Sequence, residues 1–161
     1  MYYVPDVENA WKSVYYLQNE VAFGEIVRGM HHWGASLVIV MMFLHTLRVF
    51  FTGSYKKPRE LNWIVGVGIF GVMMGLGFTG YLLPWDMKAL FATKVGIEIA
   101  ASVPFIGEYI KILLAGDSTI LGAQTLTRFF AIHVFFLPAA LFALLAAHFI
   151  MIRRQGISGP L

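Results

Sequence analysis

The chain has 161 residues, of which 58% are hydrophobic and only 13% are charged, and its formal net charge is +3. Soluble domains carry about 25% charged residues, so this composition excludes an ordinary soluble domain and indicates an integral membrane protein. The sequence contains no cysteine, which excludes disulfides, thiolate metal sites, iron–sulfur ligation and thioether-linked haem on these residues.

We interpret residues 1–161 as a single membrane domain that begins with a surface segment at 1–22. This segment is amphipathic: Trp11 could lie on a membrane surface while Lys12 faces water. No basic region precedes an apolar stretch, so we expect no signal peptide. The opening letters YYVPD are typical of a helix end, and we therefore expect that a preceding helix has been truncated.

Three apolar stretches predict transmembrane helices, at residues 24–50, 61–83 and 129–152. Each is long enough to cross a hydrocarbon core about 30 Å thick. The stretch 86–124 differs from them because it carries charges of both signs and a break at 104–107. We interpret it as an interfacial loop with two short helices.

Basic residues mark one side of the predicted membrane domain. Lys56, Lys57 and Arg59 lie in the turn after the first span, and three spans place Arg153 and Arg154 on the same side. Because cytoplasmic loops are enriched in Lys and Arg, the turn at 54–60 and the C-terminus are predicted to be cytoplasmic.

The first and third spans each carry two histidines on one face. His31 and His45 are 14 residues apart, which leaves them about 40° apart around a helix and roughly 21 Å apart in depth. His133 and His148 are 15 apart, within about 60° of one face and roughly 22 Å apart in depth. His32 lies about 140° from His45 and cannot join them. Two pairs follow, His31 with His133 on the outer side and His45 with His148 on the inner side.

A single histidine in a membrane helix can serve helix packing, but four that pair by depth and face indicate a functional site. Neutral imidazole is a common metal ligand. A bare zinc or copper ion would need further ligands, and no Cys, Asp or Glu lies at these depths. A haem supplies four ligands of its own, and a bis-histidine iron has no open position, which favours electron transfer. The pattern therefore predicts two non-covalent b haems, one in each leaflet.

Arginines near the histidines could bind haem propionates, which are carboxylates in a low-dielectric setting. Snorkelling of basic side chains at helix ends is the alternative for each of them. These candidates are Arg28, Arg48, Arg128 and Arg153.

The second span supplies glycines rather than ligands. Gly66 and Gly80 are 14 residues apart, the same separation as His31 and His45, and glycine lets a flat macrocycle approach the backbone. Helix–helix packing is the alternative, and Gly71 to Gly75 fits that pattern. Residues 66–71 also match GxGxxG, but no βαβ context surrounds them, so a dinucleotide site is excluded.

Several segments together resemble the cytochrome b family, and more narrowly its short b6-type branch in quinol:cytochrome c reductases of Gram-positive bacteria. These segments are RGMHHWGAS, LHTLRVFFTGSYKKPREL, GFTGYLLPWD, LTRFFAIHVFFLPA and HFIMIRRQGISGPL. The resemblance covers essentially the whole chain. It implies an all-α integral membrane fold in which the three spans belong to a four-helix haem-binding bundle whose first helix is missing, with short interfacial helices.

The resemblance implies a dihaem subunit that transfers electrons across a bacterial cell membrane, coupled to proton translocation, after quinol is oxidised on the outer side. His31 and His133 would ligate an outer, low-potential haem, and His45 and His148 an inner haem of higher potential. Gly66 would pack against haem, as would Gly80. The outer quinol site would involve Tyr81, Trp85, Pro104 and Ile106, although plain interfacial packing explains these four equally well. Menaquinone is the expected quinone.

The resemblance also implies partners. They are a Rieske iron–sulfur subunit, a subunit IV-like or b/c-type subunit that carries a Pro-Glu-Trp-Tyr motif, and cytochrome c, in a homodimeric complex without nucleic acid. The family has a helix before YYVPD, and in b6-type members that helix carries a cysteine that holds a third haem, of c type. No covalent haem c is possible on this cysteine-free sequence, and we expect the chain alone to be an incomplete enzyme without catalytic residues of its own.

Two other functions remain possible from the residues. A dihaem cytochrome that anchors a dehydrogenase would share the site chemistry, but the LPWD and QGISGPL motifs favour the reductase. A haem-free scaffold or metal carrier would use the same histidines. A carrier should line its path with polar groups, whereas mid-depth positions here are Leu, Val, Met, Phe and Gly.

Overall fold

The computed structural model describes residues 2–116 and 121–158, and these parts are entirely helical apart from turns and loops. The predicted all-α class is confirmed. The elements in chain order are α1 (Ala10–Asn19), α2 (Gly24–Phe51), α3 (Glu60–Tyr81), α4 (Met87–Ala101), α5 (Gly107–Ala115), α6 (Ala123–Ala131), the π-helical segment η1 (Ile132–Phe136) and α7 (Leu137–Gln155).

Three continuous helical stretches are long and apolar enough to cross a membrane: Gly24–Phe51, Glu60–Tyr81 and Ala123–Gln155. The third begins six residues before the expected start at 129, because polar contacts fix its first turn. The Thr125 hydroxyl donates to the carbonyl of Ala115 at 2.8 Å and lies 3.3 Å from the main-chain N–H of Gly122. Hydrophobicity alone does not register such a polar helix start.

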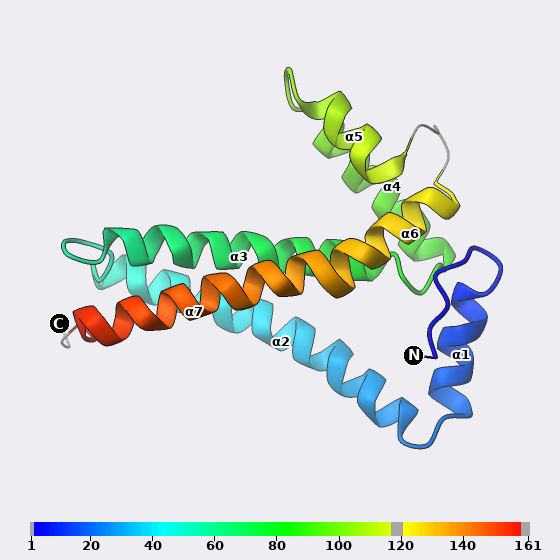
Figure 1. Ribbon diagram of the computed structural model, residues 1–161, viewed down its shortest axis with the longest axis horizontal. Helices are drawn as coiled ribbons and strands as arrows, with labels where there is room; N and C mark the ends of the chain where they lie inside the picture. Colours follow the sequence, from blue (N-terminus) through cyan, green and yellow to red (C-terminus); the bar gives the residue numbers. More distant parts are fainter. Residues whose placement is uncertain (1, 117–120, 159–161) are drawn as a thin grey trace.

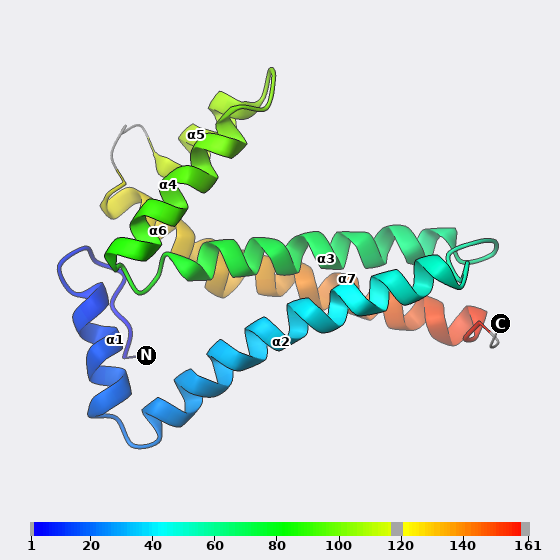
Figure 2. The same cartoon turned by 180° about the vertical axis from the view of Figure 1, so that it is seen from behind.

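The long helices form an open arrangement in which α3 is shared (Figures 1 and 2). α3 and α7 lie side by side, and α2 runs in the same direction as α7 but diverges from both toward its N-terminus. In the described residues, no Cα of α2 comes within 8 Å of a Cα of α7 or η1, whereas α3 packs against both α2 and α7. The two helices that carry the paired histidines therefore do not pack on each other.

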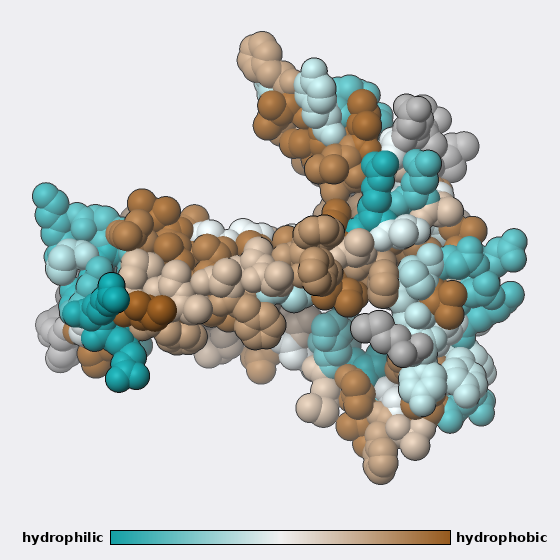
Figure 3. All heavy atoms as spheres, viewed as in Figure 1, coloured by the Kyte–Doolittle hydropathy of each residue, from teal (hydrophilic) through white to brown (hydrophobic). Residues whose placement is uncertain are grey.

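The α4–α5 hairpin projects from the junction of α3 and α6, opposite α1 (Figure 1). Its base is held by a buried cluster of Leu82, Ile97, Ala115 and Phe129, with Trp85 packed against it. The expected interfacial loop at 86–124 is described except for 117–120, and the motif at 155–161 is described only as far as residue 158. Figure 3 shows apolar side chains over the long helices and polar side chains gathered toward both ends, as a membrane-spanning domain requires.

Tyr3 ties the N-terminal segment to the loop that follows α3 and to the C-terminal end of α6. Its hydroxyl donates to the main-chain carbonyl of Leu83 at 2.8 Å. Its ring stacks on Phe130 with centroids 5.4 Å apart. Burial raises the pKa of Tyr3 to about 12. An unfolded tyrosine ionises near pH 10, so the unfolded state loses its proton first, and Tyr3 makes the fold less stable as pH rises from 10 to about 12.

We expect Tyr3→Phe to keep the ring stack but lose the hydrogen bond, at a cost of about 1 kcal/mol. The variant should unfold at a lower temperature at neutral pH and should show a smaller further loss between pH 10 and 12. Thermal unfolding followed by circular dichroism across this pH range checks both effects. Tyr109→Phe is the matched control because Tyr109 is 74% exposed, and an equal loss in that variant would contradict the role of Tyr3.

Candidate functional site

The histidine pair predicted for the outer side, His31 and His133, bridges the space between α2 and η1. The ring centroids of His31 and His133 are 6.2 Å apart and the ring planes are inclined by 84°. Two imidazole nitrogens on opposite sides of one metal ion, each about 2 Å from it, place their ring centroids about 6 Å apart. The separation of these two rings therefore matches a metal ion bound between them.

The second nitrogen of His133 is held by α3. Nδ1 lies 3.0 Å from the carbonyl oxygen of Leu76 and 3.3 Å from the hydroxyl of Thr79. A carbonyl can only accept, so Nδ1 carries the proton and Nε2 keeps the free lone pair. Metal-bound histidines show this arrangement because the outer hydrogen bond fixes the tautomer and orients the ring.

His133 lies in the π-helical segment η1, which explains the unequal spacing of the two histidine pairs. The N–H of Leu137 bonds the carbonyl of Ile132, five residues back, and Pro138 has no N–H to offer Val134. A π turn contains one residue more than an α turn. The 15-residue step from His133 therefore covers about the depth of 14 α-helical residues, roughly 21 Å, as in α2.

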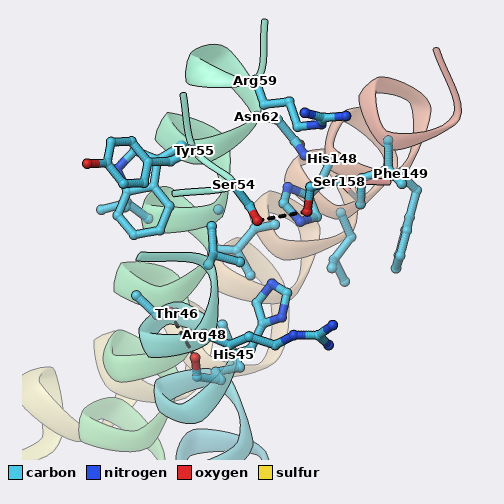
Figure 4. A pocket seen from close by; sticks show the side chains of 18 of the residues that line it. His45, Thr46, Arg48, Ser54, Tyr55, Arg59, Asn62, His148, Phe149 and Ser158 are labelled. Atoms are coloured by element: carbon cyan, nitrogen blue, oxygen red, sulfur yellow. Dashed lines mark hydrogen bonds between the residues drawn. The ribbon is translucent and has the colours of Figure 1, made fainter. Parts of the chain in front are cut away.

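The second pair, His45 and His148, which the sequence predicts for the inner side, lines a cavity of about 1110 Å³ between α2, α3 and α7. Figure 4 shows His45 and His148 pointing into it from α2 and α7. His148 Nδ1 is buried and forms no regular hydrogen bond, although the main chain of Asn62 faces the ring. The cavity is larger than the roughly 300–1,000 Å³ of ordinary small-molecule sites, and its walls are mainly apolar.

Polar groups gather at the inner end of this cavity. Arg48 and Arg59 both line it. The Ser54 and Ser158 hydroxyls lie 2.7 Å apart, and Arg59 Nε donates to the carbonyl of Gly156 at 3.4 Å, so the C-terminal tail is tied to the α2–α3 turn. Sequence reasoning used Arg59 only to assign orientation and missed Ser54 and Ser158. The GSYKKPRE turn and the QGIS tail gave no sign that they meet.

The two glycines singled out in the sequence face the two histidines of α7 and η1. A Cβ atom on Gly80 would lie 2.5 Å from His133 Cε1, and one on Gly66 would lie 3.3 Å from His148 Cε1. A Cβ on Gly71 would meet nothing within 4 Å. Close approach therefore requires glycine at position 80, and favours it at 66, whereas Gly71 is not constrained in this way.

The four predicted arginines lie in different surroundings. Arg48 lines the inner cavity beside His45. Arg28 contacts the side-chain oxygen of Gln18 in α1. Arg128 donates to the carbonyls that end α5, those of Ile112 and Leu113, at 2.5 and 2.8 Å. Arg153 is exposed and does not line the cavity.

The four predicted quinol-site residues are not brought together. Trp85 packs at the base of the α4–α5 hairpin, and Tyr81 is 54% exposed at the end of α3. Pro104 and Ile106 follow α4, whose 15 residues extend about 22 Å. Trp85 adopts a left-handed backbone conformation (φ 55°), which is uncommon for a bulky residue and is often kept at functional sites.

The donor groups fit haem better than a bare metal ion. Across residues 2–116 and 121–158, no group of three or more His, Asp or Glu side chains is placed to hold a metal ion. One site offers two imidazoles with ring centroids 6.2 Å apart, the other offers two that line one cavity, and each site has a glycine beside one imidazole. Two axial ligands and room for a flat macrocycle are what a bis-histidine haem needs.

Comparison with known proteins decides the family. The family model Cytochrome b/b6/petB matches residues 1–156. The chain belongs to the cytochrome b family. Proteins of this family bind b haems, and the predicted family membership is confirmed.

Cytochrome b sequences of known type resemble this chain over its whole length. The menaquinol:cytochrome c reductase cytochrome b subunits of Geobacillus thermodenitrificans and Bacillus subtilis (strain 168) are each 84% identical over 161 residues, all of this chain and 72% of theirs. The cytochrome b6 of Heliobacterium modesticaldum is 48% identical over 99% of this chain and 75% of its own. A solved structure titled hyperthermophilic respiratory Complex III matches with a TM-score of 0.89 and 32% identity, over 99% of this chain and 43% of that one.

We expect Gly80→Ala to displace the His133 ring, because the new Cβ would lie within 3 Å of it. The assembled protein should then lose the haem of this site, which pyridine-haemochrome quantitation per polypeptide measures. Gly71→Ala on the same helix is the control and should retain the full haem content. Full retention in Gly80→Ala would show that this cradle is not needed.

Proposed function

We propose that this cytochrome b is the dihaem electron-transfer subunit of a menaquinol:cytochrome c reductase. In this function, quinol is oxidised on the outer side of a bacterial cell membrane and electrons cross the membrane between two haems, coupled to proton translocation. The 84% identity to two menaquinol:cytochrome c reductase subunits supports the reaction and the quinone. Their sources, Geobacillus and Bacillus, support the location.

The observation that carries the proposal is the pairing of histidines across helices that do not pack together. α2 and α7 stay more than 8 Å apart in Cα separation throughout the described residues. Yet His31 reaches His133, and His45 and His148 line one cavity. We assign His31 and His133 to an outer haem and His45 and His148 to an inner haem.

When bound, each haem supplies a one-electron redox centre with no open coordination position. The residues of the chain itself bind and orient the haems and exclude water. In each pair, the two imidazoles would hold the haem iron through a nitrogen lone pair. Hydrogen bonding at His133 Nδ1 orients one of these rings. The apolar walls of α2, α3 and α7 exclude water, and Gly66 and Gly80 let the rings of His148 and His133 lie close to α3.

Orientation follows from the basic end of the bundle. The α2–α3 turn carries Lys56, Lys57 and Arg59. The Ser54–Ser158 hydrogen bond ties this turn to the tail that follows Arg153 and Arg154. All five basic residues therefore belong to one end, which we place in the cytoplasm by the positive-inside rule. The His45–His148 site then lies on the cytoplasmic side and the His31–His133 site on the outer side.

Partners complete the enzyme in this proposal. A Pro-Glu-Trp-Tyr motif does not occur in the chain, so a partner subunit would supply it to the outer quinol site, and a Rieske subunit and cytochrome c would accept electrons there. In this chain, Tyr81 and Trp85 at the outer end of α3 are the better placed candidates for contact with quinol. Pro104 and Ile106 lie a helix length away and would contact the partner subunits or the membrane surface.

We expect His148→Leu, in the assembled complex, to lose the inner haem and keep the outer one. The reduced-minus-oxidised spectrum should then retain about half of the b-type absorbance, with one component in a potentiometric titration instead of two. His32→Leu is the control, because the His32 ring contacts Trp33 and position 32 is about 100° around the helix from His31, and this variant should keep both components. Two intact components in His148→Leu would contradict the assignment.

A further inference from the structure

The two histidine sites are built on α3 as two copies of one arrangement, 14 residues apart. In the outer copy, Leu76 and Gly80 face His133. In the inner copy, Asn62 and Gly66 face His148 in the same order along the helix. The carbonyl residue comes four positions before the glycine in each copy. The main-chain settings correspond, so a difference in chemistry between the copies must come from side chains, including the buried amide oxygen of Asn62 where the outer copy has Leu76.

The residue immediately before the glycine is one such difference. Before Gly80 the chain has Thr79, whereas before Gly66 it has Val65. Thr79 is only 3% exposed. Its hydroxyl donates its one hydrogen to the carbonyl of Gly75 at 2.8 Å, and its oxygen lies 3.3 Å from His133 Nδ1. Since the hydroxyl hydrogen is used, this oxygen accepts from the Nδ1–H group.

His133 Nδ1–H is therefore shared between two acceptors, the carbonyl of Leu76 and the hydroxyl of Thr79. His148 Nδ1 is buried but makes no regular hydrogen bond. Val65 has no polar side-chain atom with which to provide one. The imidazoles at the two ends of α3 thus differ in hydrogen bonding although their main-chain settings correspond.

We propose that Thr79 is a positioning residue that, by accepting from His133 Nδ1–H, lowers the midpoint potential of the outer haem relative to the inner one. The proposal rests on the assignment of haems made under Proposed function. A hydrogen bond accepted from Nδ1–H makes the imidazole a more basic ligand. A more basic ligand stabilises ferric over ferrous iron, and so it lowers the potential. Electron transfer from the outer to the inner haem then becomes more favourable.

The test is an exchange of the two residues in the assembled complex. Thr79→Val removes the acceptor with little change in shape, and we expect it to raise the outer potential. Val65→Thr adds a hydroxyl that can donate to the carbonyl of Leu61 and accept from His148 Nδ1–H, and we expect it to lower the inner potential. Each substitution should change the oxidised-to-reduced ratio of the nearby haem about three- to tenfold at a fixed ambient potential. This change corresponds to a shift in midpoint potential of about 28 to 59 mV.

Potentiometric titration followed optically and by electron paramagnetic resonance resolves the two haems without relying on turnover. Thr79→Ser keeps the hydroxyl, so the midpoint potential of the outer haem should stay at the wild-type value. Thr127→Val is the matched control, since Thr127 makes the same bond to a carbonyl four residues back but is exposed. It should leave both potentials unchanged.

The possible outcomes distinguish a wrong haem assignment from a wrong role for Thr79. A wild-type complex without two b-type components would overturn the haem assignment itself. Two components with an outer potential that Thr79→Val leaves unchanged would overturn only the role of Thr79. If Thr79→Val does not retain the outer haem, Val65→Thr decides, because an unchanged inner potential in that variant overturns the proposal and a lowered one supports it.

Discussion

The structure depends on the separation between α2 and α7, which do not pack against each other in the described residues. The two helices run in the same direction, and α3 is the helix that contacts both. Water cannot fill such a space within a bilayer at low cost, since its walls are apolar and offer few partners. Two pairs of imidazoles reach across it, at depths roughly 21 Å apart. A haem held by these imidazoles would complete the packing between the helices.

α3 acts as the common reference for both sites. Its glycines 14 residues apart set two positions of close approach, and one turn before Gly80 the carbonyl of Leu76 faces the His133 imidazole. The π-helical segment at 132–136 adjusts the third span to this reference by absorbing one residue. Two chemically similar sites can then differ through single side chains such as Thr79 and Val65, without a change in the scaffold.

Much of the arrangement of histidines and glycines could be predicted from the sequence, because depth and face in a membrane helix follow from residue number. The histidine pairs and the link between Gly66 and Gly80 needed only a rise of about 1.5 Å and a turn of about 100° per residue. Tertiary contacts could not be predicted from the sequence in this way. Arg128 is drawn to the carbonyls that end α5, and the length of α4 separates Pro104 from Trp85. Neither effect leaves a periodic signal in the sequence. The family resemblance implied a role for these residues but did not say where they lie in the fold.

Two irons, each held by one pair of histidines at opposite depths, are the centre of the proposed function. Anomalous scattering at the iron absorption edge, from crystals of the assembled complex, locates them directly. We expect two iron positions about 21 Å apart, one between His31 and His133 and the other between His45 and His148. A single iron associated with this chain, or an iron bound by His32 instead of either pair, would contradict the account.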